Sequence, residues 1–433
     1  MMAESRPNFL FFLPDQHRPD FVGTNPDLPV RMPNLTRLGR RGVRFTNCYT
    51  PSPVCAPARA CLASGRHYDR CRVPDNSVDY PLDQPTYYQS LRDAGYRVAG
   101  CGKFDLHKAT NDWGLDGRRL IEEWGFTDGI DNEGKYDGVI SYGNAGGPMG
   151  PYMAYLEELG LARAHVEDLN SRDASSTFPT ALPEEAYCDN WVAENGLSLL
   201  RGIPVGQPWH LVVNFTGPHN PWDVTERMKE RWEAVEFPPA HRNDQFGGEV
   251  HCRVRQNYAA MVENIDRQVG RFLEELESRD ELDNTVIIYS SDHGEMLGDH
   301  NNWGKGTWRE ASSHVPLTVC APDSQENASS DAPVPLHDLC ATMIDYAGAE
   351  ALPEMDARSL RPLLRGERSE HRKYVTSGLR DWRMVFDGRH KLVRQEESIR
   401  LFDLEEDPHE DVDIAGERPG LVEDLSVMLP GEG

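Results

Sequence analysis

The chain has 433 residues and a mass of 48.9 kDa, and 38% of its residues are hydrophobic. This apolar content is enough for a large core, which excludes a disordered polymer. Asp and Glu outnumber Lys and Arg by 71 to 45, so the formal net charge is −26. A surface this acidic argues against nucleic acid and against an anionic membrane as the main partner.

The first clear pattern is the apolar run from Phe9 to Leu13, which Pro14 and Asp15 follow at once. The run is too short for the hydrophobic region of a secretory signal, so it predicts a buried strand. No stretch reaches the roughly 18 apolar residues of a membrane span. Nine cysteines, an odd number scattered along the chain, favour reduced thiols and a cytoplasmic location over a disulfide framework.

Strand-like and helix-like segments alternate along the chain, which predicts an α/β fold. The longest helix is expected at 255–278, where apolar residues recur at the helical period from Tyr258 to Leu276. Segment 107–187 is rich in Gly, Asp and Trp and has weak periodicity. Two interpretations of it stay open, an insertion that shapes a pocket and a long surface excursion. The other expected elements are strands at 8–13, 96–100, 209–215 and 284–290 and helices at 32–41 and 85–94.

After residue 366 the pattern changes to short strands, at 374–377, 382–386 and 390–393. The turn Asp387-Gly388 joins the last two. This pattern predicts a small antiparallel C-terminal subdomain at 367–433, beside a larger domain at 1–366.

One short motif combines a nucleophile with a cation. Pro57 suits the first turn of a helix, which would put Cys55 at or just before the helix N-terminus, where free N–H groups favour negative charge. Arg59 follows one helical turn later and supplies a fixed positive charge. Taken alone, the Cys-x-Pro pattern is a weak signal, and a buried structural cysteine explains it better.

The run Cys55-Ala56-Pro57-Ala58-Arg59, followed by Gly65, resembles the sulfatase signature Cys-x-Pro-x-Arg. The order of the surrounding motifs is similar to that of the type I sulfatases of the alkaline-phosphatase-like superfamily. The resemblance extends from Asp15 to the stretch 401–408, and Ala63 and Ser64 depart from the residues more usual there. It implies an alkaline-phosphatase-like sandwich, with a large central mixed β-sheet flanked by helices. It also implies that a formylglycine-generating enzyme oxidises Cys55 to formylglycine.

Two polar pairs follow predicted strands, Asp15-Gln16 near the N-terminus and Asp292-His293 after 284–290. The resemblance implies that these four residues, together with Cys55 in its modified form, hold one divalent metal ion. Gln16 and His293 resemble the residues that the choline-sulfatase and phosphonate monoester hydrolase branches have at these positions. Calcium is the expected ion and manganese the alternative. The other interpretation of His293 is a histidine that holds the ligands in place without binding the metal itself.

The resemblance also implies residues that handle an anionic ester. Lys103 and Lys305 are expected to bind the sulfate oxygens, and His219 to bind the ester and protonate the leaving alcohol. In the stretch after Lys103, Asp105 stands where the family usually has His, and His107 lies two residues later. Either of these two is the predicted base that releases sulfate.

Asn76 matches an asparagine near the ester in the choline-sulfatase-like branch, although an exposed turn is an alternative for it. The catalytic group predicted from the resemblance is Cys55, Arg59, Lys103, His107, His219 and Lys305.

We therefore expect a sulfatase that hydrolyses a sulfated sugar or an aryl or alkyl sulfate. A phosphonate monoester or phosphodiester hydrolase on the same scaffold is the alternative. A non-catalytic binding protein would have lost the nucleophile or the ligands, yet Cys55, Asp15 and Asp292 are present. The sequence leaves the alcohol part of the substrate and homo-oligomer formation open. Four tryptophans could line a pocket but fit a core role better: Trp113, Trp124, Trp222 and Trp308.

Overall fold

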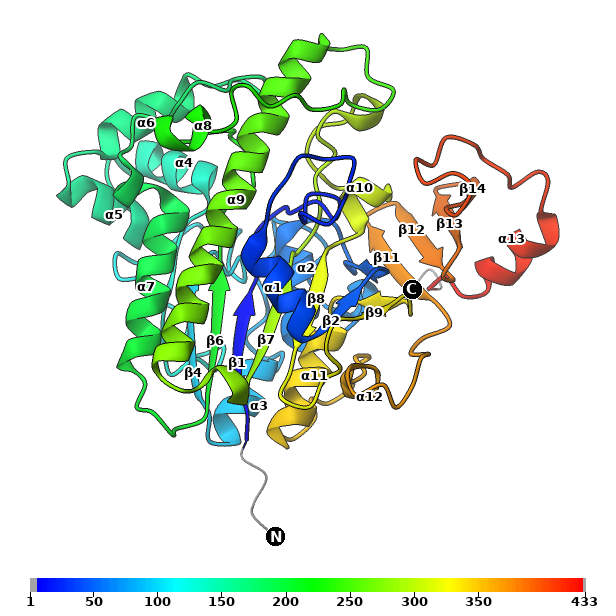
Figure 1. The fold of residues 1–433 in the computed structure, drawn as a ribbon, viewed down its shortest axis with the longest axis horizontal. Helices are drawn as coiled ribbons and strands as arrows, with labels where there is room; N and C mark the ends of the chain where they lie inside the picture. The colour runs from blue at the N-terminus through cyan, green and yellow to red at the C-terminus, as the bar shows by residue number, and fades with distance from the viewer. Residues whose placement is uncertain (1–5, 431–433) are drawn as a thin grey trace.

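The structure, a computed structural model, describes residues 6–430. Within these residues the centre is an eight-stranded mixed sheet with helices on both faces (Figure 1). This confirms the predicted α/β fold. In spatial order the strands are β5 (Asp128–Asp131), β4 (Arg97–Gly102), β6 (Trp209–Asn214), β1 (Asn8–Phe12), β7 (Thr285–Ser290), β8 (Leu317–Cys320), β2 (Val43–Phe45) and β9 (Ala328–Ser330).

The strands from β5 to β7 run parallel, and β8 pairs with β7 in the antiparallel direction. Parallel strands end at the same edge of a sheet, where open α/β folds place their ligand sites. Asp15 follows β1, Lys103 follows β4 and Asp292 follows β7. The topology therefore brings three predicted site residues to one edge.

Strand β1 shows why the sheet is covered on both faces, because successive side chains of a strand point to opposite sides. Phe9 and Phe11 pack in one apolar cluster, and Leu10 and Phe12 pack in the other. All five β1 residues are buried. Helices α2 (Cys55–Ser64), α3 (Tyr87–Asp93) and α11 (Asp338–Ala347) contribute to the first cluster, and α1 (Pro33–Arg41), α7 (Cys188–Gly202) and α9 (Gly248–Ser278) to the second.

Helix α9 ends at Ser278 as predicted but begins at Gly248, well before the expected Arg255. Its first residues have no capping side chain, and Gly247 occupies the N-cap, so the sequence offers no start signal. The early turns contact loops from elsewhere in the chain: Gln256 Nε2 donates to the carbonyl oxygen of Val235, which lies after α8 (Glu226–Glu230), and the ring of His251 stacks on that of Trp303.

Segment 107–187 contributes β5, which pairs with β4 as the edge strand of the central sheet. The rest of it forms α4 (Lys135–Ala145), α5 (Pro151–Glu158) and α6 (Ala162–Asn170). Trp113 and Trp124 from this segment are buried, as are Trp222 and Trp308 elsewhere. The four tryptophans thus have the predicted core role.

The C-terminal part forms a separate antiparallel sheet, seen beside the main body in Figure 1. Its strands are β11 (Val375–Leu379), β12 (Trp382–Phe386), β13 (His390–Gln395) and β14 (Ser398–Asp403), and α13 (Pro419–Ser426) packs on β13. Strand β14 was not predicted, and its first two residues, Ser398 and Ile399, are exposed. The domain boundary at residue 366 stays a prediction.

The remaining elements are short. They are β3 (Cys48–Tyr49), β10 (Val334–Pro335), α10 (Glu310–Ser313), α12 (Arg361–Leu364) and four 3₁₀ turns, η1 (Tyr68–Arg70), η2 (Glu184–Ala186), η3 (Leu282–Asn284) and η4 (Asp299–Asn301). Among the described helices, none has the length and apolar character needed to cross a membrane.

Candidate active site

Cys55 is the first residue of α2, as its spacing to Pro57 predicts. All ten residues of this helix are buried, and Cys55 is only 1% exposed. Asn76 lies beside the helix start, where its Oδ1 accepts a hydrogen bond from the backbone N–H of Ala56 at 3.0 Å. Asn76 therefore satisfies one of the free amides of the helix N-terminus, and its expected contact with the ester stays a prediction.

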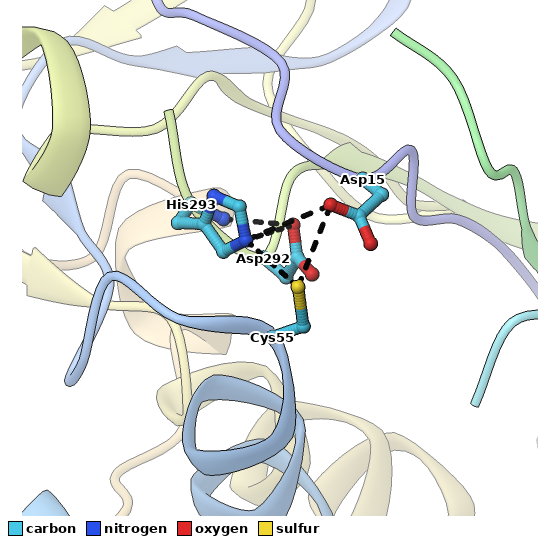
Figure 2. Close-up of side chains that lie close together, drawn as sticks. All are labelled: Asp15, Cys55, Asp292 and His293. Atoms are coloured by element: carbon cyan, nitrogen blue, oxygen red, sulfur yellow. Dashed lines mark hydrogen bonds and ion pairs between the residues drawn. The ribbon is translucent and has the colours of Figure 1, made fainter. Parts of the chain in front are cut away.

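Four side chains converge on the sheet edge as potential metal ligands: Asp15, Cys55, Asp292 and His293 (Figure 2). Their ligand atoms all lie within 4.8 Å of one another, and all four residues are buried. Cys55 Sγ is 3.3 Å from His293 Nε2 and 3.7 Å from Asp15 Oδ1. His293 Nδ1 is 3.0 Å from the carbonyl oxygen of Gly294, which turns Nε2 toward the group.

Gln16 lies next to these four residues. Its backbone N–H donates to Asp292 Oδ1 at 3.0 Å, and its φ of 72° is in the left-handed region. Its side-chain oxygen Oε1 is buried and has no hydrogen-bond partner among the described residues. A buried oxygen without a partner beside two carboxylates is what a site for a divalent cation requires.

Two lysines meet at the same sulfur. Lys305 Nζ lies 2.9 Å from Cys55 Sγ and Lys103 Nζ lies 3.4 Å from it. Lys103 also forms an ion pair with Asp15. Both cations thus lie against the predicted nucleophile position, where an anionic ester would bring its negative charge.

These charges set the protonation states of the group. Burial alone would raise the pKa of Asp15, but Lys103 and Lys305 outweigh it and hold that pKa well below its ordinary value. Burial lowers the pKa of His293 to about 4, so its imidazole is neutral and able to bind a metal. Burial, reinforced by Asp15, raises the pKa of the Cys55 thiol. The unmodified cysteine is therefore a poor nucleophile.

The donor set of Asp15, Gln16, Asp292 and His293 fits a divalent cation. It offers carboxylate oxygens, an amide oxygen and a neutral imidazole nitrogen, and its charge is less negative than that of an all-carboxylate cage. Calcium and manganese both accept such donors. The sulfur of Cys55 marks the place where the modified side chain would add an oxygen.

Arg59 extends from α2 beneath the ligands. Its Nε donates to Asp292 Oδ2 at 3.0 Å, and its Nη1 donates to Asn214 Oδ1 at 3.0 Å and to the carbonyl oxygen of Lys103. Burial opposes the charge of Arg59, yet Asp292 and Asp15 raise its pKa above the ordinary value. Arg59 thus holds Asp292 in place, and this contact is a second role beside the one expected from the motif.

The two candidates for the base lie in different surroundings. His107 Nε2 is 2.7 Å from Asp131 Oδ2, and no contact joins His107 to Cys55 among the described residues. Although burial opposes it, the hydrogen bond that His107 donates to the Asp131 carboxylate raises the pKa of His107. Asp105 instead lies 3.0 Å from Lys103 Nζ, which in turn contacts Cys55. The structure therefore joins Asp105, and not His107, to Cys55 through one lysine.

His219 lies on the loop after β6, and its Nδ1 contacts the backbone carbonyl oxygen of Asn220. Burial and the positive charge of Lys305 hold the pKa of His219 well below its ordinary value. The backbone bridge between Asp15 and Pro218 places this loop beside the predicted site.

Three further residues support the site and were not predicted from the sequence. Asn214 ends β6 and holds Arg59. Lys108 pairs with Asp105 at 3.2 Å. Glu295 accepts a hydrogen bond from Gln16 Nε2. Each has a sequence signal, because Asn214 closes a predicted strand, Lys108 is a rare lysine close to Lys103, and Glu295 follows the Asp292-His293 pair.

A second group of ligand-type side chains lies between the main body and the C-terminal segment: His241, His300 and Asp411. His241 Nε2 is 3.0 Å from Asp411 Oδ2, and Arg309 Nη1 is 3.0 Å from His300 Nε2. These atoms already have protein partners, so the group ties the two parts of the chain together.

Comparison with known proteins now adds to this geometry. The family model described as "Sulfatase" matches residues 7–349. The chain belongs to the sulfatase family. A second model, "N-sulphoglucosamine sulphohydrolase, C-terminal", matches residues 298–425. Membership makes the chain a sulfuric ester hydrolase, as predicted.

Several relatives match over most of their length. A choline-sulfatase of Rhizobium meliloti is 29% identical over 98% of this chain and 86% of its own. An arylsulfatase of Clostridium perfringens is 26% identical over 94% of this chain and 89% of its own. Among solved structures, a phosphonate monoester hydrolase of Agrobacterium radiobacter has a TM-score of 0.82 at 22% identity, covering 98% of this chain and 94% of its own. This structural similarity confirms the alkaline-phosphatase-like fold.

Proposed function

We propose that the chain hydrolyses the sulfate monoester of a sugar or of an aryl or alkyl alcohol, using a formylglycine made from Cys55 and one divalent metal ion. The observation that carries the proposal is the position of Cys55 Sγ. It lies 2.9 Å from Lys305 Nζ on one side and 3.3 Å from His293 Nε2 on the other. The side chain of residue 55 can therefore meet a cation-binding group and an anion-binding group at once.

The metal would be held by Asp15, Gln16, Asp292, His293 and the modified residue 55. Calcium is our first choice, because three of these ligands are side-chain oxygens, and manganese is the alternative. The cation makes a hydroxyl beside it more acidic and therefore more nucleophilic at neutral pH. The hydrate of the formylglycine offers one hydroxyl for attack on sulfur and a second whose deprotonation releases sulfate.

The protein's own side chains then have distinct tasks. Lys103 and Lys305 hold the sulfate oxygens and neutralise the charge that develops on them. His219 is the group that protonates the leaving alcohol. A base must accept the proton that is released with sulfate. Contacts lead from residue 55 through Lys103 to Asp105, so Asp105 is a better candidate for this base than His107.

The burial of Cys55 affects its maturation. A residue that is 1% exposed in the folded chain offers no access to a modifying enzyme. We infer that a formylglycine-generating enzyme acts before the chain folds, so the active protein requires co-expression with it. The nine cysteines are all free in the structure, which supports the proposal of a cytoplasmic location.

A phosphonate monoester or phosphodiester hydrolase is the second candidate, because Gln16 and His293 at the ligand group resemble that branch as well. The two functions are separated by kcat/KM of the matured protein on a nitrophenyl sulfate, a nitrophenyl phosphonate and a nitrophenyl phosphodiester. The leaving group is the same in all three. We expect the sulfate to react fastest and Cys55→Ala to react with none. A phosphonate or phosphodiester rate more than about tenfold above the sulfate rate would support the second candidate.

A further inference from the structure

Glu295 is fully buried beside Gln16, and each of its carboxylate oxygens accepts a hydrogen bond. Oε1 accepts the backbone N–H groups of Leu297 at 2.9 Å and Gly304 at 2.6 Å. Oε2 accepts a hydrogen bond from Gln16 Nε2. The two backbone donors therefore fix the orientation of the carboxylate, and Oε2 faces Gln16.

This arrangement decides which end of the Gln16 amide is free. Every contact of the Glu295 carboxylate comes from a donor, the two backbone N–H groups at Oε1 and the NH₂ group of Gln16 at Oε2. Gln16 Nε2 has a second, longer contact with Asn220 Oδ1 at 3.5 Å, which also requires a donor. The oxygen Oε1 then remains as the free end, buried and without a partner among the described residues.

We propose that Glu295 is a positioning residue that orients the Gln16 amide so that its oxygen, and not its nitrogen, is offered to the metal. Through the hydrogen bond from Gly304, it also holds the start of the loop that carries Lys305. This inference rests on the metal site proposed above. The sequence gives Glu295 no such role, because Gln16 and Glu295 are 279 residues apart.

The substitution Glu295→Gln tests the orientation without removing volume. The N–H groups of Leu297 and Gly304 both require an acceptor at the position of Oε1, so the new amide places its oxygen there. Its NH₂ group then faces Gln16, which must rotate its own amide to accept. The NH₂ group of Gln16 would point at the metal and repel it.

A second substitution, at residue 16, should restore an oxygen that faces the metal. In the double variant Gln16→Glu/Glu295→Gln, the new carboxylate at residue 16 accepts from the new amide at residue 295 with one oxygen. Its other oxygen is free for the metal. In the single variant Gln16→Glu the new carboxylate faces that of Glu295, so the two carboxylates repel each other or share one proton, and the added charge is only partly expressed. The single variant therefore measures the effect of a carboxylate at residue 16 when residue 295 offers no donor.

The experiment is isothermal titration calorimetry of calcium and of manganese into chelator-treated protein with unmodified Cys55, for the wild type and the three variants. We expect Glu295→Gln to bind at least about tenfold more weakly, the usual effect of losing a group that orients a ligand. Gln16→Glu should then raise affinity by at least about tenfold more in the Glu295→Gln background than in the wild type. Glu133→Gln is the matched control, since Glu133 is also fully buried and accepts two backbone N–H groups, from Tyr152 and Met153. Its metal affinity should equal that of the wild type.

Two results would overturn the inference. One is unchanged metal affinity in Glu295→Gln, and the other is an equal effect of Gln16→Glu in both backgrounds, which would show that residues 16 and 295 are not coupled. A wild-type protein that binds neither ion would overturn the metal site itself and this inference with it. Circular dichroism of each variant confirms that the compared proteins are folded.

Discussion

Replacing His219 with alanine should slow hydrolysis in proportion to how poorly the alcohol leaves. The Nδ1 atom of His219 contacts the carbonyl oxygen of Asn220, which can only accept, so Nδ1 carries a proton. In the neutral imidazole Nε2 then has no proton to give. Only the imidazolium form can donate from Nε2 to the leaving oxygen.

The size of the effect follows from the protonation of that imidazole. Burial and Lys305 hold the pKa of His219 well below its ordinary value, so the neutral form dominates in the free enzyme at pH 7. Above its pKa, the imidazolium fraction falls about tenfold for each unit of rising pH, and a general acid contributes about 10²- to 10⁴-fold when it is protonated. For a sulfated sugar, the loss in kcat/KM on His219→Ala should therefore be about tenfold larger at pH 6 than at pH 7.

The assay compares kcat/KM of matured wild type and His219→Ala on a nitrophenyl sulfate and a sulfated sugar at both pH values. The nitrophenolate leaves without a proton, so its rate should change little. Lys305→Ala is the contrasting variant, because a cation that binds the sulfate oxygens is needed for either alcohol. Its loss should slow the nitrophenyl sulfate at least as much as the sulfated sugar, since removing Lys305 also lets the pKa of His219 rise. Equal losses on the two substrates for His219→Ala, or a loss independent of pH, would refute the role as general acid.

Two further predictions concern the charges around the ligands. Arg59→Met leaves the buried Asp292 carboxylate without its partner at 3.0 Å, and should lower the free energy of unfolding in chelator by about 3–5 kcal/mol, measured with urea. Arg118→Met, which removes a half-exposed pair with Asp128, should lower it by less than about 1 kcal/mol, and an equal loss in the two variants would contradict the buried role of Arg59. Dialysis against chelator should abolish turnover and added calcium or manganese should restore it, whereas unchanged metal affinity in Asp292→Asn would place the ion elsewhere.

Much of the fold could be predicted because its signals are local. The apolar run before Pro14 gave β1, and the β-branched run before Ser291 gave β7. The ends of helices and strands were harder to predict where tertiary packing determines them. Helix α9 extends to Gly248 without a capping side chain, and its first turns contact Val235 and Trp303, which are far from them in sequence.

The residues of the candidate site also fall into those that could be predicted from local sequence and those that could not. Cys55, Asp15 and Asp292 could be found because each stands in a short motif or directly after a strand. The partner of His107 could not, because its contact with Asp131 depends on how β5 pairs with β4. The same holds for Arg59, whose hydrogen bond to Asn214 joins residues that only the sheet brings together. Sequence motifs indicate which residues take part, while their contacts depend on the topology.

The central claim is that residue 55, once converted to formylglycine, is the nucleophile of sulfate ester hydrolysis. Preparations with different degrees of maturation can be made by varying co-expression of a formylglycine-generating enzyme, and conversion of Cys55 lowers the mass of its peptide by about 18 Da, the difference between a thiol and an aldehyde. The most direct test plots turnover of a nitrophenyl sulfate per chain against the converted fraction measured by mass spectrometry. We predict a straight line through the origin, with Cys55→Ala at zero. Full turnover in unconverted protein or in Cys55→Ala would contradict the claim.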